Sequence, residues 1–249
     1  MAEIIPGAEP MSVDGGSIGL LVLHGFTGNP QSVRPLADAA AAAGHSVEMP
    51  LLSGHGTRIE DMLPTRWSDW SADAEAAYEK LAARTEKVVV AGLSMGGSLT
   101  CWLASRHPEI AGIVCVNPAT RAAPEVRDFI QGLVDAGEEV MDGIGSDVKR
   151  EGVVELAYKG TPLAPLLSMF DAANEMGDDT FARITCPLLL FTSPEDHVVP
   201  PSDSDYLAEA VSGPVERISC DDSYHVATID NDQDLIAEHT VRFIDQVTG

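Results

Sequence analysis

Residues 88–100 read VVVAGLSMGGSLT, an apolar run that leads directly into a glycine-rich turn. The apolar run Val88–Ala91 is typical of a strand that is buried on both faces of a parallel sheet. The residues after Gly97 have the spacing of a helix, which Pro108 limits. Ser94 therefore lies on a sharp strand-to-helix turn, where small residues let the helix pass close to the strand.

The G-x-S-x-G pattern around Ser94 is the pattern that exposes a nucleophilic serine at the top of an α/β sheet. A helix that begins at such a turn also favours developing negative charge at its N-terminus. An ordinary glycine-rich turn has the same local pattern. The interpretation therefore depends on whether the chain also supplies a base, an acid and an oxyanion donor.

Other apolar runs predict a mostly parallel sheet that is covered by helices on both faces, because strands alternate with helical stretches. The predicted strands are Leu20–His24, Ser46–Met49, Val88–Ala91, Gly112–Asn117, Leu188–Thr192 and Val215–Ser219. The predicted helices include Ser32–Ala43, Ser68–Arg84 and Gln233–Val247.

The alternation of strands and helices breaks once, between Pro118 and about Phe181, where no strand is evident. This stretch is too long for a structureless loop in a compact domain. We therefore predict a small cap at residues 120–180, inserted into an α/β core formed by residues 1–119 and 181–249.

A serine hydroxyl needs a base to take its proton and an acid to orient that base. In hydrolases with this turn, the acid and then the histidine follow the serine along the chain. Asp196 comes after an apolar strand, and His225 comes just beyond the last predicted strand. Glu195 and His197 compete with Asp196, which we favour because Pro194 fixes the turn.

The oxyanion hole of such an enzyme uses the backbone N–H after the nucleophile, here Met95, and a second N–H from the loop after an early strand. The stretch LLVLHGFTGNP supplies this loop, with Phe26 as the expected donor, and Gly25 and Gly28 allow its backbone to bend. His24 ends the strand, so we expect it to hold the loop through a hydrogen bond rather than to act as the base.

Composition excludes several classes of protein. The 249 residues are 45% hydrophobic, an ordinary globular share, and the formal net charge is −24, which should repel nucleic acid and anionic membranes. This acidity fits either solubility or adaptation to salt. No run approaches the roughly 20 apolar residues of a membrane span. The start, MAEIIPGAEP, has no signal-peptide features, so we expect a cytoplasmic protein without stable membrane insertion.

Cysteine and histidine spacing predicts neither a metal site nor a disulfide. The four cysteines form no C-x-x-C pair, so buried free thiols are expected at Cys101, Cys115, Cys186 and Cys220. His55 lies in a second glycine–histidine turn without the spacing of a zinc motif, which indicates a structural turn. No cofactor is expected.

The motifs together resemble those of bacterial monoacylglycerol lipases and the closely related small carboxylesterases. In the core these are H-G-F-T-G at His24–Gly28, G-H-G-T at Gly54–Thr57, G-L-S-M-G-G at Gly92–Gly97, S-P-E-D-H-V-V-P-P at Ser193–Pro201 and S-Y-H-V-A-T at Ser223–Thr228. In the predicted cap, I-G-S-D at Ile144–Asp147 and E-L-A-Y at Glu155–Tyr158 resemble the lipase branch, so the resemblance covers nearly the whole chain.

The resemblance implies an α/β-hydrolase with Ser94 as nucleophile, Asp196 as acid and His225 as base, and with the N–H groups of Phe26 and Met95 as oxyanion donors. The substrate it implies is a small lipid ester.

The resemblance also places two cap residues at the substrate. Glu155 holds the place of a glutamate that hydrogen-bonds the glycerol hydroxyls, and Ile144 that of a residue packed against the glycerol side of the pocket. Without the resemblance, Glu155 in the apolar run VVELAY would be interpreted as part of a solvated helix face. The cap stretch AGEEVMDG is more acidic than in the family and, like 164–177, leaves the acyl-chain length open.

Two alternatives to a monoacylglycerol lipase remain. One is a general carboxylesterase without a preference for glycerol, and the other is a non-catalytic ligand-binding protein of the same fold. A dehalogenase of this fold needs an aspartate at the turn, which Ser94 argues against.

Overall fold

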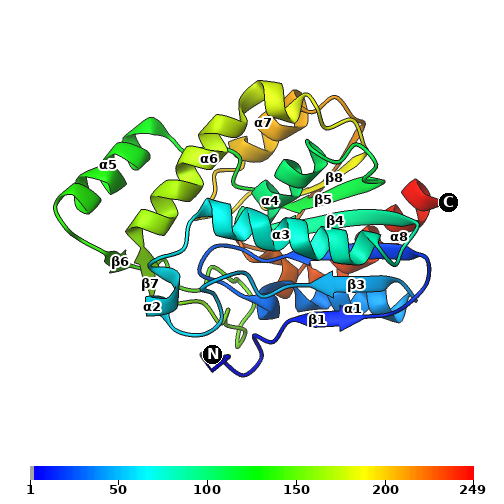
Figure 1. Ribbon diagram of the computed structural model, residues 1–249, viewed down its shortest axis with the longest axis horizontal. Helices are drawn as coiled ribbons and strands as arrows, with labels where there is room; N and C mark the ends of the chain where they lie inside the picture. The colour runs from blue at the N-terminus through cyan, green and yellow to red at the C-terminus, as the bar shows by residue number, and fades with distance from the viewer. Residues whose placement is uncertain (1–2) are drawn as a thin grey trace.

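The computed structural model describes residues 3–249, in which a seven-stranded sheet lies between two layers of helices (Figure 1). The strand order is β1-β3-β2-β4-β5-β8-β9, and only β1 pairs antiparallel, with β3. The strands are β1 Met11–Val13, β2 Ile18–Leu23, β3 Ser46–Met49, β4 Lys87–Leu93, β5 Gly112–Val116, β8 Leu188–Thr192 and β9 Val215–Ser219. The predicted mostly parallel sheet is confirmed; β1, an edge strand of three residues, was not predicted.

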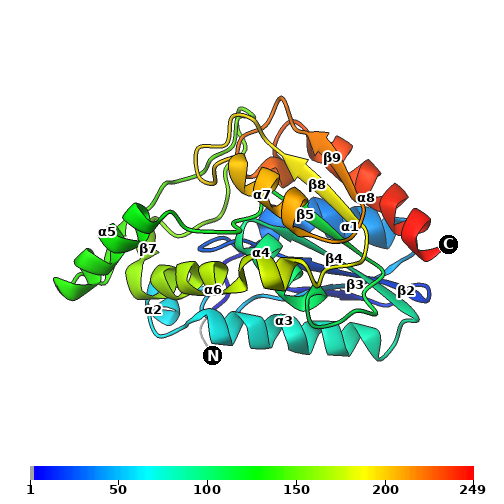
Figure 2. The ribbon, with the colours of Figure 1, turned by 90° about the horizontal axis from the view of Figure 1, so that it is seen from above.

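The helices cover both faces of the sheet (Figure 2). One face carries α1 and α8, and the other carries α3, α4, α6 and α7. The bounds are α1 Arg34–Ala42, α2 Ile59–Met62, α3 Trp67–Ala82, α4 Met95–Ala104, α7 Ser202–Ala210 and α8 Gln233–Thr248; two short 3-10 helices are Pro30–Val33 and Ala227–Ile229.

Strand β2 shows how the sheet divides the core. Leu20 and Val22 pack into the cluster that includes side chains of α1 and α8. Leu21 and Leu23 pack into the cluster on the opposite face, with Trp70 of α3. All four leucine and valine side chains are fully buried. An uninterrupted apolar run therefore serves both faces, as expected for a central parallel strand.

The segment between β5 and β8, residues 117–187, is called the insertion below. It contains α5 Pro124–Asp135, β6 Val140–Asp142, β7 Gly160–Pro162 and α6 Leu163–Phe181. Strands β6 and β7 form an antiparallel pair, so the expectation that this stretch has no strand is wrong. Each strand has only three residues, too few for a periodic pattern to show. The boundaries of a cap at residues 120 and 180 stay a prediction.

The insertion is attached to the core unevenly. Helix α6 packs against α3 and α4, and the Trp67 N–H at the start of α3 donates to Ser168 Oγ over 3.0 Å. Helix α5 packs on α6 and stands at the edge of the molecule, away from the sheet (Figure 1). The insertion therefore has one firmly packed helix and one outlying helix.

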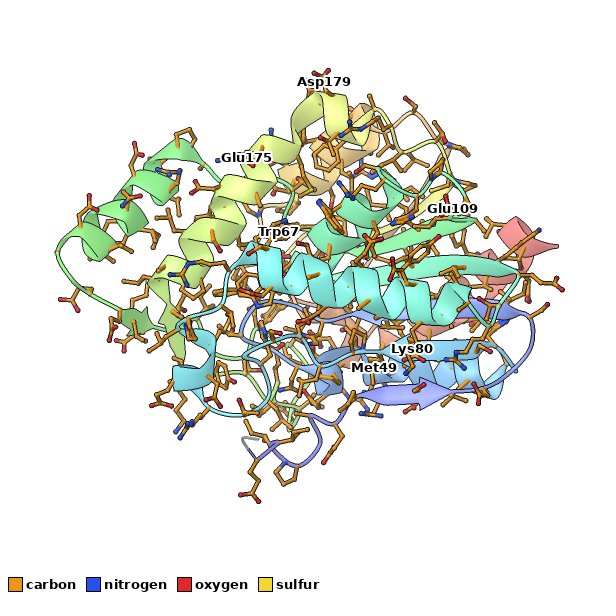
Figure 3. All side chains as sticks on the ribbon, in the orientation of Figure 1. Met49, Trp67, Lys80, Glu109, Glu175 and Asp179 are labelled. Atoms are coloured by element: carbon orange, nitrogen blue, oxygen red, sulfur yellow. The ribbon has the colours of Figure 1, made fainter. Side chains whose placement is uncertain are left out.

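Acidic side chains lie on the surface of the molecule, and three of the four cysteines are buried. Figure 3 shows Glu175 and Asp179 on the outer side of α6, where both are exposed. All four cysteines are free, and Cys186 alone among them is only partly buried. No helix within residues 3–249 is long and apolar enough to cross a membrane.

Candidate active site

Ser94 lies between β4 and α4 with φ 56° and ψ −118°, a conformation that is rare for a residue with a side chain. Backbone hydrogen bonds hold it there. The Ser94 N–H donates to Val116 O over 3.0 Å, and the Ala119 N–H donates to Ser94 O over 3.3 Å. The end of β5 therefore keeps the serine in its strained turn at the carboxyl edge of the sheet.

The glycines around Ser94 are required by close contacts between backbone segments. A Cβ atom added at Gly92 would lie 2.1 Å from Gly96 O, and one added at Gly96 would lie 2.1 Å from Leu23 O. Both distances are far shorter than real carbon–oxygen contacts. Only glycine lets α4 start this close to β2 and β4.

The predicted acid and base are in direct contact. Asp196 Oδ2 lies 2.7 Å from His225 Nδ1, and these side chains are 1% and 8% exposed. The other carboxylate oxygen, Oδ1, accepts the N–H groups of Val198 and Val199, each over 2.8 Å. These two donors fix the orientation of the carboxylate, which in turn fixes the imidazole.

Asn117 joins the two loops that carry Asp196 and His225. It follows β5 with φ 44° and is buried. Its Nδ2 donates to His225 O over 2.8 Å, and its Oδ1 accepts the Ser193 N–H over 2.8 Å. Sequence reasoning had assigned Asn117 only to a strand end; a polar residue directly after a buried strand is the signal that could have identified it.

The two competitors of Asp196 have other partners. Glu195 is exposed, and its Oε2 lies 3.3 Å from Lys149 Nζ. His197 Nδ1 lies 2.8 Å from Asp147 Oδ1. The geometry therefore brings Asp196, and neither of its neighbours, onto the His225 ring.

The loop after β2 lies directly against Ser94. A Cβ atom added at Gly25 would lie 3.3 Å from Ser94 Cβ. The Phe26 ring packs edge-on against Trp70, with ring centroids 5.6 Å apart. In the described part of the chain, the N–H groups of Phe26 and Met95 have no protein acceptor. The structure thus leaves both N–H groups without a partner among the described residues, and their role as oxyanion donors stays a prediction.

Two buried histidines support this loop without titrating near neutral pH. Burial lowers the pKa of His24 to about 4 and that of His55 to about 3. His24 Nδ1 lies 3.0 Å from Gly25 O, and the Leu52 N–H donates to His24 Nε2 over 3.2 Å. These contacts fit a neutral ring that donates through Nδ1, so His24 holds the loop as predicted and does not serve as a base.

Glu155 lies in an extended loop between β6 and β7 rather than on a helix, so the alternative of a solvated helix face is wrong. The loop is attached to the segment after β2: the Tyr158 N–H donates to Thr27 O over 3.1 Å, and the Leu156 N–H donates to Gln31 Oε1 over 3.2 Å. These bonds hold the segment that carries Glu155 against the loop after β2.

The Glu155 carboxylate sits against the site itself. A Cβ atom added at Gly28 would lie 2.7 Å from Glu155 Oε1. Burial of the carboxyl group raises its pKa to about 7, while the positive charge of His225 and the Ser32 hydroxyl act in the opposite direction. Although the residue as a whole is partly exposed, its acidic group is therefore in a poorly solvated position near His225.

Two other predicted residues, Ile144 and Ser94, make no hydrogen bond to Asp196 or His225 through their side chains within residues 3–249. Ile144 lies between two glycines and is 67% exposed, so its contact with substrate stays a prediction. Ser94 Oγ has no hydrogen bond to His225 within residues 3–249; such contacts often tighten only when substrate binds. No cluster of three or more metal-ligating side chains occurs in the same range of residues.

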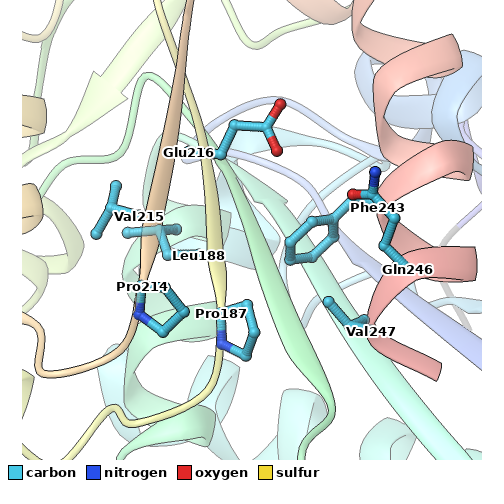
Figure 4. A pocket seen from close by; sticks show the side chains of 8 residues that line it. All are labelled: Pro187, Leu188, Pro214, Val215, Glu216, Phe243, Gln246 and Val247. Atoms are coloured by element: carbon cyan, nitrogen blue, oxygen red, sulfur yellow. The ribbon is translucent and has the colours of Figure 1, made fainter. Parts of the chain in front are cut away.

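A separate apolar pocket lies at the opposite edge of the sheet. Pro187 and Pro214, at the amino ends of β8 and β9, face Phe243 of α8 across it (Figure 4). The polar groups described above all gather at the carboxyl ends of the strands, where open α/β sheets bind ligands. This pocket is therefore not part of the candidate active site.

Comparison with known proteins agrees with the fold and the site. The family model described as "Serine aminopeptidase, S33" matches residues 19–234. The thermostable monoacylglycerol lipase of Bacillus sp. (strain H-257) is 44% identical over 99% of this chain and 98% of its own length. The carboxylesterase of Bacillus subtilis (strain 168) is 26% identical over 96% of this chain and 97% of its own length.

Solved structures show the same relationship. A structure from work on LipS and LipT, two metagenome-derived lipolytic enzymes, matches with a TM-score of 0.93 and 42% identity over 98% of this chain and 100% of its own. A soluble variant of monoglyceride lipase from Saccharomyces cerevisiae, with a TM-score of 0.77 but 14% identity over all of this chain and 96% of its own, shares the fold. This chain therefore belongs to the serine aminopeptidase S33 family of α/β-hydrolases, among relatives that include lipases and carboxylesterases.

Proposed function

We propose that this chain is a serine ester hydrolase that cleaves monoacylglycerols to glycerol and a fatty acid through an acyl-enzyme on Ser94. The observation that carries the proposal is the Glu155 carboxyl group, held beside the oxyanion loop and close to His225. The similarity to the Bacillus monoacylglycerol lipase supports the same substrate class.

Acylation begins when His225 Nε2 takes the proton of Ser94 Oγ, which attacks the ester carbonyl carbon. The carbonyl oxygen becomes an oxyanion that the N–H groups of Phe26 and Met95 bind. Each donor contributes about 3 kcal/mol, because the charge that it meets exists only in the transition state. Collapse of the intermediate breaks the bond to the glycerol oxygen, and His225 returns its proton to that oxygen.

Deacylation repeats these steps with water. His225 removes a proton from water, the hydroxide attacks the acyl carbonyl, and Ser94 leaves with the proton that His225 returns. Asp196, bound 2.7 Å from Nδ1, keeps the ring in the tautomer that presents Nε2 and stabilises its positive form. Neither half of the cycle needs a metal or cofactor.

Glu155 supplies the preference for glycerol. A monoacylglycerol carries two free hydroxyl groups, and a partly desolvated carboxylate is their natural acceptor, since burial without a donor is unfavourable. A hydrogen bond to a charged group contributes about 1.5–3 kcal/mol, or roughly tenfold to a hundredfold in specificity. A diacylglycerol loses one of the hydroxyls and adds a second chain, and a methyl ester has neither hydroxyl.

The experiment compares kcat/KM for four substrates: a monoacylglycerol, the diacylglycerol and the methyl ester of the same fatty acid, and an aminoacyl anilide. We expect the monoacylglycerol to be cleaved fastest among the esters and the anilide to be inert. Equal rates on the monoacylglycerol and the methyl ester would identify a general carboxylesterase. Turnover of the anilide alone would identify a peptidase, and turnover of none would identify a binding protein.

A further inference from the structure

Asp147 bonds to both of the loops that carry the acid and the base. It lies in the insertion, between β6 and β7, and its side chain is 11% exposed. Asp147 Oδ2 accepts the backbone N–H of His225 over 3.0 Å and that of His197 over 3.2 Å. Its other oxygen lies 2.8 Å from His197 Nδ1. A single carboxylate from the insertion thus ties together two loops of the core.

A second carboxylate, Asp230 of the core, binds backbone N–H groups of the insertion. Asp230, fully buried in the core, accepts the N–H groups of Lys149 and Arg150 over 2.7 and 2.8 Å and that of Tyr224 over 2.9 Å. The Val226 N–H donates back to Asp147 O over 3.1 Å. The backbone at 147–150 is therefore bound to the backbone around His225 on both sides.

Asp147 binds the backbone next to the contact between Asp196 and His225, so it can affect the alignment of these two side chains. His225 bears the N–H that Asp147 binds, and His197 directly follows Asp196. The two bonded N–H groups thus flank the 2.7 Å contact between Asp196 and the His225 ring. Hydrogen bonds to an ionised acceptor are among the strongest in proteins, and a loss of order in this contact would act directly on the proton transfer.

We propose that Asp147 is a positioning residue of the catalytic triad, through which the insertion sets the alignment of His225 with Asp196. This inference rests on the proposed serine hydrolase chemistry but not on the glycerol preference. Asp147 does not touch the reacting atoms, so its effect reaches the chemistry through the backbone of His225 and His197.

The role predicts a defined kinetic signature for Asp147→Ala. We expect kcat to fall about tenfold to a hundredfold, with KM changed less than about twofold, on both p-nitrophenyl acetate and a monoacylglycerol. The rate at which a fluorophosphonate labels Ser94 should fall in parallel, because it depends on the same base. A residue that contacts the glycerol group would instead change only the monoacylglycerol reaction.

Three further variants separate positioning from general stability. Asp147→Asn keeps one oxygen that can accept an N–H, so it should recover part of the lost kcat. His197→Ala removes the imidazole contact but leaves both backbone N–H groups, so kcat should stay within about threefold of wild type. Asp142→Asn changes an exposed aspartate on β6 of the same insertion and serves as the matched control, with no expected effect.

The measurements are made on folded protein, with circular dichroism and a thermal melt for each variant. Asp147→Ala with wild-type kcat would overturn the proposal, as would a loss equal to that of Asp142→Asn. Should Asp147→Ala not fold, Asp147→Asn is decisive: a kcat loss without a change in KM supports the role, and wild-type kcat contradicts it. A wild-type enzyme inactive on monoacylglycerols would refute the proposed substrate, while p-nitrophenyl acetate and fluorophosphonate labelling would still test Asp147.

Discussion

The turn at Ser94 and the insertion are built in opposite ways. At the turn, Gly92 and Gly96 leave no space, since an added Cβ atom would meet backbone oxygen at 2.1 Å. In the insertion, a Cβ atom added at Gly132 would meet nothing within 4 Å, and Phe129 of α5 is 61% exposed. Ser94 is thus fixed by close packing of backbone. In the insertion, by contrast, only α6 is firmly packed, and the segment around Asp147 and Glu155 is held by polar contacts.

The largest effect should come from removing the nucleophile. Ser94→Ala should fold normally, since it deletes one partly buried hydroxyl, and should lower kcat by about four to six orders of magnitude. Ester hydrolysis by purified protein measures this. Near wild-type turnover, or a fluorophosphonate adduct on another residue by mass spectrometry, would refute the assignment.

The next effect concerns the acid. Asp196→Asn should lower kcat by about three to four orders of magnitude, because the amide favours the wrong tautomer of His225 and does not stabilise its cation. Glu195→Gln, a matched change at the exposed neighbour, should stay within about threefold of wild type. A larger loss from Glu195→Gln than from Asp196→Asn in steady-state kinetics would make Glu195 the acid.

Paired glycine substitutions test the contrast in packing. Gly96→Ala should lower the free energy of unfolding by more than about 3 kcal/mol, because its Cβ atom would collide with Leu23 O and force the backbone apart. Gly132→Ala, on α5, should raise it by up to about 1 kcal/mol, since alanine is the better helix former and the site is open. Urea unfolding measures both; equal changes in the two variants would remove the contrast.

A smaller effect should appear in the pH dependence of stability. The pKa of Glu155 is about 7 in the folded chain and 4.5 without burial, so the folded state binds more protons between these values. The contribution of Glu155 to stability is therefore present below about pH 4.5 and is lost as the pH rises through about 7.

Glu155→Gln removes this titration. Relative to this variant, the wild type should lose stability between pH 5 and pH 8, by at most about 2.5 kcal/mol. One pKa unit corresponds to about 1.4 kcal/mol, this pH range covers only part of the titration, and the exposed part of the residue lowers the value further. Urea midpoints at the two pH values provide the test. A difference between the two proteins that does not change with pH would mean that the carboxyl group is well solvated.

The sequence predicts the core around Ser94 better than it predicts the insertion. The parallel sheet, its covering helices and the turn at Ser94 could be predicted because each depends on local patterns of apolar residues and glycine. The candidates Asp196 and His225 could be found because chain order and position after a strand are visible in the sequence. Their contact in the structure agrees with that choice.

The parts that sequence reasoning missed depend on pairings between distant segments. Strands β1, β6 and β7 have three residues each and exist only through their partners. In the sequence, Asn117 and Asp147 look like ordinary polar residues. Only the folded chain brings their side chains within hydrogen-bond distance of the His225 backbone, over 2.8 and 3.0 Å. The environment of Glu155 likewise depends on the loop after β2, more than a hundred residues away in the chain.

The most direct test of the proposed function is the ratio of kcat/KM for a monoacylglycerol to kcat/KM for the methyl ester of the same fatty acid, in wild type and in Glu155→Ala. If Glu155 binds the glycerol hydroxyls, the ratio should fall about tenfold to a hundredfold in the variant, while methyl ester hydrolysis stays nearly unchanged. An unchanged ratio, whether both activities persist or both fall together, would contradict the role of Glu155 and leave a general carboxylesterase.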